Sequence, residues 1–150
     1  MLVLGHADLK KNSMRVVLDT HVILSALLFA NGNLAWLKNA WQAKFIRPVI
    51  SSATKEDLFG SLNYPKFNLS IAEQDLLLED FFPYCETASI SSWMPSHGIF
   101  SQVFLAVAHK AKVDALVSVE KDLLALRGSF IPPILTVEEL RKRLQEERLA

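Results

Sequence analysis

Several kinds of residue and motif are scarce in this chain of 150 residues, and each shortage excludes a class of protein. A single cysteine, Cys85, rules out an internal disulfide and a metal site built from several cysteines. Sixteen basic and sixteen acidic residues cancel, so no net positive charge indicates a protein that coats nucleic acid. The five glycines form no glycine-rich loop of the kind that cradles a phosphate group.

Long apolar runs are also missing, because charged residues or proline interrupt every stretch before the roughly 20 residues that a membrane span needs. Residues 1–13 lack the apolar segment and cleavage site of an export signal. We therefore expect a cytoplasmic protein with no membrane segment. Residues 1–13 are expected to form a disordered extension, with Met14 as an alternative start. Residues 14–150 suffice for one domain with a hydrophobic core.

The overall composition is more apolar than is usual for a small domain. Hydrophobic residues make up 51% of the chain, and the mean hydropathy is +0.23. Such a composition predicts that part of the apolar surface is covered by a second subunit or another partner.

Segments of strand and helix character alternate along the chain. Strands are predicted in residues 15–18, 45–50, 84–89, 115–119 and 134–136, where apolar and β-branched residues dominate. Helices are predicted in residues 22–29, 34–44, 52–63, 71–81, 101–111 and from 137 onward, and residues 90–100 have the composition of a loop. This alternation predicts an α/β fold with three layers, in which helices cover both faces of a central, mostly parallel sheet.

Two of the predicted strands end directly on acidic residues. The first runs into Asp19, and the strand at 115–119 runs into Glu120 and then Asp122. In an open parallel sheet, side chains at the carboxyl ends of the strands line the ligand crevice. Two acidic strand ends in one small domain therefore indicate a pocket for a divalent metal ion.

The order of these elements resembles the PIN domain, a family of metal-dependent ribonucleases that includes toxins of bacterial toxin–antitoxin modules. Three segments carry the likeness: residues 17–28 (VLDTHVILSALL), 62–67 (LNYPKF) and 111–124 (AKVDALVSVEKDLL). The likeness covers nearly all of residues 15–144, and these segments are most similar to the group described as toxin components.

The resemblance implies that Mg²⁺ or Mn²⁺ is held by carboxylates from distant segments, because hard divalent cations prefer oxygen ligands. Asp19 matches the first acidic residue of the family and Asp122 the last. Asp57 and Glu120 match two further positions. These four residues are the predicted catalytic and metal-binding set.

The chain also departs from the family pattern. Asp57 stands where the family has glutamate, Gln102 where it has an acidic residue, and Val119–Glu120 where it has glycine and aspartate. His21 stands where the family has asparagine. These changes remove one formal negative charge and predict weaker metal binding, with reduced or no nuclease activity. The shorter Asp57 and the longer Glu120 could alternatively compensate for each other.

Each candidate residue also has a structural interpretation. Asp19 could cap the following helix or end the strand in an ion pair, and Asp122 could cap the helix at Leu123. His21 is expected to support the site rather than bind metal, with the role of general base as a minor alternative. Ser118 could orient a carboxylate or simply pack in its strand. Thr20 and Gln102 complete the predicted surroundings of the site.

The leading functional hypothesis is a ribonuclease that cuts single-stranded RNA by metal-assisted hydrolysis. By resemblance, it would be the toxin of a toxin–antitoxin module, form a homodimer and bind a small antitoxin protein. The alternative is a PIN-like module that binds nucleic acid or a partner without catalysis, which Gln102 favours. A third hypothesis, a phosphoacceptor receiver domain, needs a pair of acidic residues at the first strand end, where only Asp19 is present.

Overall fold

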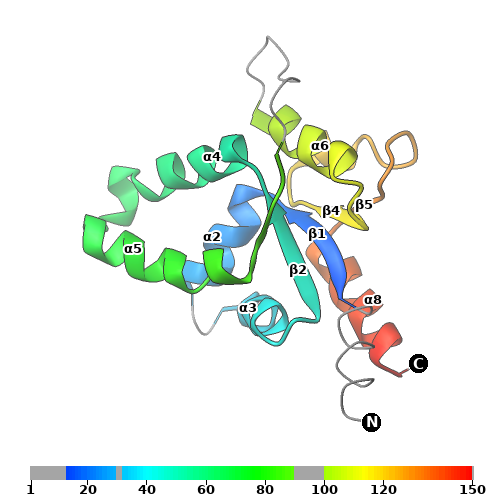
Figure 1. Cartoon of the computed structure of the whole chain (residues 1–150), viewed down its shortest axis with the longest axis horizontal. Helices are drawn as coiled ribbons and strands as arrows, with labels where there is room; N and C mark the ends of the chain where they lie inside the picture. The colour runs from blue at the N-terminus through cyan, green and yellow to red at the C-terminus, as the bar shows by residue number, and fades with distance from the viewer. Residues whose placement is uncertain (1–12, 30–31, 90–99, 150) are drawn as a thin grey trace.

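The computed structural model describes residues 13–29, 32–89 and 100–149, and Figure 1 shows their arrangement. The predicted extension at residues 1–13 therefore lies outside the described residues except for Ser13, as does most of the predicted loop at 90–100. The five strands in the described residues are β1 (Met14–Leu18), β2 (Ile46–Ile50), β3 (Glu86–Thr87), β4 (Ala115–Val117) and β5 (Ile134–Leu135). The α-helices are α2 (Thr20–Leu28), α3 (Ala35–Gln42), α4 (Ser52–Leu62), α5 (Ile71–Glu79), α6 (Phe100–Lys110), α7 (Lys121–Leu124) and α8 (Val137–Leu149).

The strands form one sheet in the order β3-β2-β1-β4-β5, and all four pairings are parallel. The chain first builds outward from β1 through β2 to β3, and then returns to the other side of β1 with β4 and β5. The order of the strands therefore reverses between β1 and β4. Open α/β sheets bind their ligands outside the carboxyl ends of the strands at such a reversal.

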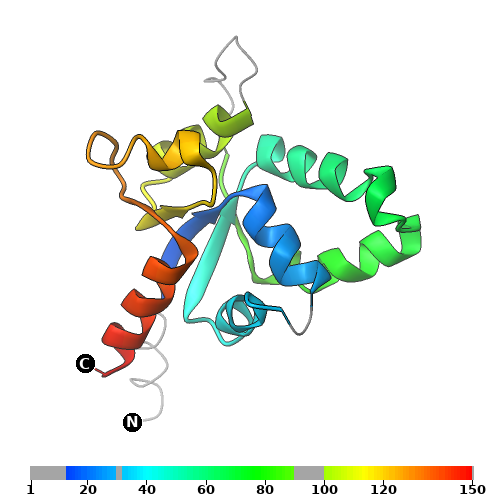
Figure 2. The ribbon, with the colours of Figure 1, turned by 180° about the vertical axis from the view of Figure 1, so that it is seen from behind.

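Helices cover both faces of the sheet, which confirms the predicted three-layer α/β/α architecture. Alternate residues of β1 point to opposite faces, as the period of two in a strand requires. Val16 and Leu18 join one core cluster with α2, α3, α4 and α8, whereas Val17 joins a second cluster with α6 and α7. Figure 1 shows α6 on the viewer's side of the sheet, and Figure 2 shows α2 and α8 on the other side.

The helices α4 and α5 form an arm that extends sideways from the sheet (Figures 1 and 2). Serine residues begin both helices: Ser51 and Ser70 each accept a backbone N–H bond in a capping box. At the two ends of this second helix, Phe81 is fully buried just after α5, whereas Ile71, its first residue, is 67% exposed.

Candidate metal and nucleic-acid site

Asp19 lies immediately after β1 and begins α2. Its backbone is extended, and its side-chain Oδ1 accepts a hydrogen bond of 3.0 Å from the backbone N–H of Val22, so it is the N-cap of α2. The residue is only 1% exposed. The capping role predicted as an alternative for Asp19 is therefore present. Capping uses only one of the two lone-pair sites of Oδ1, so it does not exclude a ligand from that oxygen.

The other oxygen of Asp19 is held from the neighbouring strand. Ser118, the fully buried residue that follows β4, donates its hydroxyl to Oδ2 of Asp19. The backbone N–H of Val119 donates to the same oxygen over 3.2 Å. Ser118 Oγ in turn accepts the backbone N–H of Glu120 over 2.9 Å. Ser118 therefore orients the carboxylate and connects the end of β1 to the end of β4.

These hydrogen bonds leave Asp19 one acceptor position. Each carboxylate oxygen offers about two lone-pair sites. Among the described residues, Oδ2 receives two donors and Oδ1 receives one. The remaining lone pair is on Oδ1, which can bind a cation or a water molecule.

A second acidic side chain is attached to the same strand end through Thr20. The Thr20 hydroxyl donates to Oδ2 of Asp57, which lies in the second turn of α4. The position of α4 is fixed by its capping box, in which Ser51 and Thr54 exchange hydrogen bonds at the end of β2. Asp57 is thus positioned next to the N-terminus of α2 by a neutral hydroxyl donor, while its Oδ1 has no hydrogen bond within the described residues.

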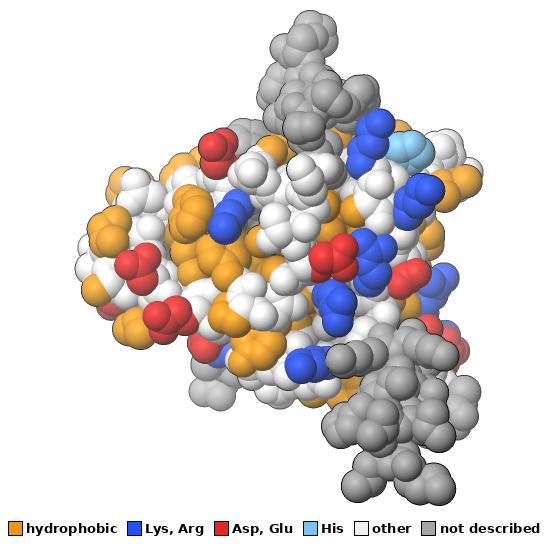
Figure 3. All heavy atoms as spheres, viewed as in Figure 1, with side chains coloured by type: hydrophobic (Ala, Val, Ile, Leu, Met, Phe, Trp, Pro, Cys, Tyr) orange, Lys and Arg blue, Asp and Glu red, His pale blue; other side chains and the backbone are white. Residues whose placement is uncertain are grey.

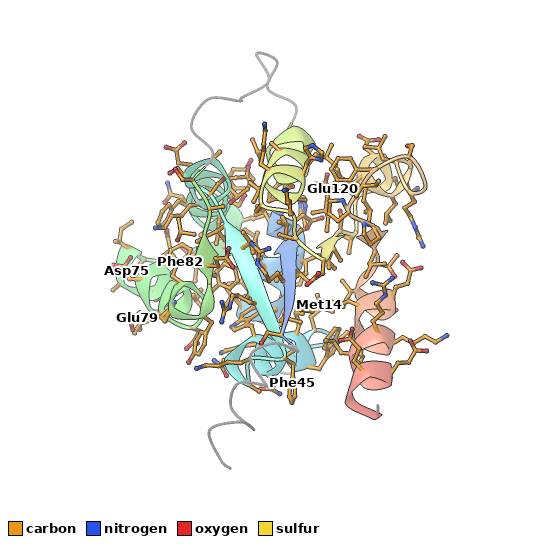
Figure 4. The ribbon with its side chains drawn as sticks, turned by 45° about the vertical axis from the view of Figure 1, so that its right-hand side comes forward. Met14, Phe45, Asp75, Glu79, Phe82 and Glu120 are labelled. Atoms are coloured by element: carbon orange, nitrogen blue, oxygen red, sulfur yellow. The ribbon has the colours of Figure 1, made fainter. Side chains whose placement is uncertain are left out.

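His21, in the first turn of α2, faces Glu120, which follows β4. Its Nδ1 lies 3.2 Å from Oε1 of Glu120, and the two side chains are 67% and 32% exposed. Figure 4 shows Glu120 at the upper end of the sheet, opposite the end where Met14 and Phe45 lie. The imidazole thus contacts an acidic side chain of the candidate site, and the supporting role of His21 stays a prediction.

Asp122 and Gln102 lie near the starts of two other helices. Asp122 is an exposed residue in the first turn of α7, and none of the described residues bonds to its side chain. Glu120 is the N-cap residue of α7 but makes no side-chain capping bond. Gln102 belongs to the first turns of α6, and its side chain lies outside the described residues.

The donor chemistry of this edge fits a hard divalent cation. Asp57 Oδ1, Glu120 Oε2 and both oxygens of Asp122 are carboxylate oxygens without a hydrogen bond in the described part of the chain, and Asp19 Oδ1 accepts one hydrogen bond there. Oxygen ligands of this kind suit Mg²⁺ and Mn²⁺. The spacing is open, however: no three acidic, histidine or cysteine side chains of the described ranges stand together as a metal-binding group.

The predicted acidic residues have no lysine or arginine partner among the residues that the structure describes. Arg15 pairs with Glu86 over 2.6 Å at the other end of β1. In the view of Figure 3, lysine, arginine and acidic side chains are mixed on the right-hand side, while hydrophobic side chains gather over α4 and α5. Among the described residues, the four candidate carboxylates are therefore not neutralised by an ion pair with lysine or arginine.

Reasoning from the sequence missed the backbone part of this site. The amides of Val22 and Val119 both donate to Asp19, and no side-chain motif reveals them. The only available signal was the position of Asp19 and Ser118 at the ends of adjacent parallel strands, since main-chain N–H groups point outward where a strand turns into a helix.

Comparison with known proteins agrees with this geometry. No curated protein shows significant similarity to the chain. Within the described residues, no helix has both the length and the apolar character needed to cross a membrane. The family model of the PIN domain matches residues 15–122, a range that holds the four candidate acidic residues and ends within α7. This match spans well over half of the sequence, and the chain therefore belongs to the PIN domain family.

Proposed function

We propose that this chain is a cytoplasmic, metal-dependent endoribonuclease that hydrolyses phosphodiester bonds of single-stranded RNA, and that it is the toxin of a toxin–antitoxin module. The observation that carries the proposal is the hydrogen-bonded connection at the reversal of the strand order. Ser118 joins Asp19 to the backbone of Glu120, and Thr20 joins the same strand end to Asp57. PIN domains generally have a nuclease-type fold, use divalent metal ions and bind nucleic acid.

In this proposal Asp19, Asp57, Glu120 and Asp122 hold Mg²⁺ or Mn²⁺. When bound, such an ion activates a water molecule and neutralises charge that develops on the phosphate. Asp19 supplies its free Oδ1 lone pair, while Ser118 and the Val119 amide keep the carboxylate in one orientation. Thr20 does the same for Asp57. His21 contacts Glu120 and is placed to hold that carboxylate or to accept a proton from water.

Activity is expected to be weak. Gln102 contributes no charge at a position where the family has an acidic residue. The open spacing of the described acidic side chains points in the same direction, because Mg²⁺ requires near-ideal octahedral geometry. Mn²⁺ is therefore the better choice of cation for a first assay.

The test is cleavage of a labelled single-stranded RNA by the purified chain with Mn²⁺ or Mg²⁺, beside Asp19→Asn. Asp19→Asn removes the carboxylate charge and also turns its amide N–H toward a backbone N–H, that of Val119 or that of Val22. It should therefore abolish both cleavage and Mn²⁺ binding seen by calorimetry. Equal cleavage by the two proteins would reject the assignment, since it would come from a contaminating nuclease or another site.

A gain-of-function variant gives the complementary test. Gln102→Asp restores the missing carboxylate and should tighten Mn²⁺ binding and increase RNA cleavage. Gln145→Glu, an added acid on the exposed face of α8, is the matched control and should change neither. If Gln102→Asp behaves like this control, the weak activity has another cause than the missing acidic residue.

We also propose that the chain forms a homodimer and binds a small antitoxin protein at the acidic edge. The apolar composition and several exposed large hydrophobic residues, including Ile71, Leu76 and Phe59, support an interface. Light scattering of the purified chain at micromolar concentration should give the mass of a dimer. A monomer under these conditions would contradict this part of the proposal.

A second candidate function is a PIN-domain module that binds RNA or a partner without catalysis. The open spacing of the acidic groups in the described residues favours it specifically. In that case the chain would bind single-stranded RNA in EDTA, would show no cleavage with Mn²⁺, and Gln102→Asp alone would not create activity.

A further inference from the structure

A pocket of about 400 Å³ lies beside the acidic edge, on the side of α2 and α8. It is lined by residues from four places in the chain: Ser25 in α2 and its C-cap residue Phe29, Asn33 in the following loop, Val119 after β4, and Glu138 in α8. Its volume falls within the range of small-molecule sites, which are mostly apolar with a few polar groups. The roles proposed above for the acidic residues do not use this pocket.

Two contacts make the pocket continuous with the acidic edge. Val119, which forms part of its wall, donates its backbone N–H to Asp19 and directly precedes Glu120. Ser25 is one helical turn after His21 on the same face of α2, and His21 contacts Glu120. A molecule with one group at the acidic side chains can therefore place a neighbouring group in the pocket.

Two apolar side chains of the pocket are largely exposed to solvent. Phe29 is 58% exposed and Val119 is 54% exposed. Gly32 lies directly against the Phe29 backbone: its N–H donates to the Phe29 carbonyl over 2.9 Å, and an added Cβ would come within 3.0 Å of Phe29 Cβ. Proteins stack the bases of single-stranded RNA on solvent-facing aromatic rings of this kind.

The polar part of the pocket contains a carboxylate without a partner. At the start of α8, Thr136 and Glu139 exchange hydrogen bonds of 3.1 and 2.8 Å, which fixes the first turn of the helix. Glu138 lies in this fixed turn, is exposed and makes no hydrogen bond or ion pair within the described residues. A carboxylate only accepts hydrogen bonds, whereas the Asn33 amide both donates and accepts.

We propose that this pocket binds one unstacked guanine base of single-stranded RNA beside the acidic edge; the inference rests on the proposed function. The Watson–Crick edge of guanine carries two adjacent N–H donors, which match the two oxygens of Glu138. Adenine and cytosine each place an acceptor beside their amino group, and uracil offers a single N–H between two carbonyls. Phe29 and Val119 contact the face of the base, and Asn33 is available for its O6.

The experiment measures binding of two fluorescein-labelled uridine decamers by anisotropy, one with a central guanosine and one with a central adenosine. Both titrations are made in EDTA, so that binding is separated from cleavage. The parent chain should bind the guanosine RNA about tenfold more tightly, as expected for one bidentate base contact. Glu138→Gln should remove this preference, and Phe29→Ala should weaken binding of both RNAs by about tenfold.

Glu147→Gln is the matched control, because Glu147 is exposed on the same helix, far from the pocket. It should leave both affinities and the preference unchanged. Equal affinity of the parent for the two RNAs, or no binding of either, would overturn the proposal, as would an undiminished preference in Glu138→Gln. Circular dichroism of each variant shows whether the fold is intact.

The outcome for the pocket is independent of the outcome for catalysis. A guanine preference in EDTA without cleavage in Mn²⁺ would support the pocket and reject the ribonuclease. Cleavage in Mn²⁺ without a preference for RNA that contains guanine would support the ribonuclease and reject the pocket.

Discussion

The charged side chains at the two ends of β1 have different kinds of partner. Near its start, Arg15 is neutralised by Glu86 through bonds of 2.9 and 2.6 Å, and its backbone N–H donates to Asp114. The guanidinium also donates to the carbonyls of Ala111 and Lys112 after α6. After the end of β1, Asp19 is more deeply buried, yet its described partners are two amides and one hydroxyl.

This difference separates structural charge from charge that is available to a ligand. The opposite charges of an ion pair largely cancel, so little electrostatic attraction remains for a third group. Neutral donors orient a carboxylate but leave its negative charge in place, as a cation site requires. We therefore propose that the end of β1 carries the functional site, whereas the start of β1 is part of the scaffold. The following predictions test this comparison, from the largest expected effect on stability to the smallest.

Asp19→Ala should have the largest effect. It removes the N-cap of α2 and leaves the Ser118 hydroxyl and the Val119 amide without their acceptor. The free energy of unfolding should fall by about 3 kcal/mol, the sum of a lost cap and a buried unsatisfied donor. Urea denaturation measures it. A loss below about 0.5 kcal/mol would mean that the network contributes little to folding.

Ser118→Ala should reduce stability by about 1.5 kcal/mol, because a buried hydrogen-bonding group is lost and the Glu120 amide loses its acceptor. Mn²⁺ binding should also weaken, since Asp19 is no longer held in one orientation. Ser118→Thr keeps the hydroxyl and is the matched control for metal binding. The orienting role is wrong if alanine and threonine variants bind Mn²⁺ equally well.

Glu86→Gln should reduce stability by about 0.5–1 kcal/mol at pH 7, because both members of its ion pair are a third exposed to solvent. The hydrogen bond from Arg15 lowers the pKa of Glu86 in the folded chain. A lowered pKa stabilises the fold at pH values above the unfolded-state value of about 4.3, and this contribution disappears as the pH falls through the folded-state value.

The stability difference between the parent and Glu86→Gln should therefore shrink as the pH falls below about 4. Thermal unfolding at several pH values checks this, and RNA cleavage at pH 7 should remain at the level of the parent. A large loss of cleavage in Glu86→Gln would break the distinction between the two ends of β1.

Glu120→Gln should have the smallest effect on stability, within about 0.5 kcal/mol, because its contact with His21 is largely exposed. Mn²⁺ affinity should nevertheless fall by at least the roughly tenfold that loss of a supporting residue causes. Glu79→Gln, on the distant helix α5, should alter neither quantity. Unchanged Mn²⁺ affinity in Glu120→Gln would remove Glu120 from the ligand set.

Much of the fold could be predicted from the sequence because local signals agree with the tertiary structure. The apolar run before Asp19 forms β1, and the serines at 51 and 70 cap helices as their residue type favours. The short strand β3 was predicted only as a longer edge strand at 84–89, because an edge strand has few buried positions to mark its length.

The candidate site was less predictable, for a physical reason. Strand ends identify Asp19 and Ser118 as neighbours, but the direction of each hydrogen bond depends on backbone amides that every residue type shares. The partner of Thr20 could not be predicted either, since the spacing of Asp57 in α4 does not reveal which helix faces it. Exposed Asp122 has no packing constraint from which its direction could be inferred.

The bond between Ser118 and Asp19 joins residues that are 99 positions apart in the chain. During synthesis the N-terminal part of a domain emerges first, so β1, β2 and the α4–α5 arm leave the ribosome well before β4 does. A nascent chain shorter than 118 residues carries Asp19 without the hydroxyl that orients it. The acidic edge is therefore completed only after Glu120 and Asp122 have been made, and translation products that stop before these residues lack it.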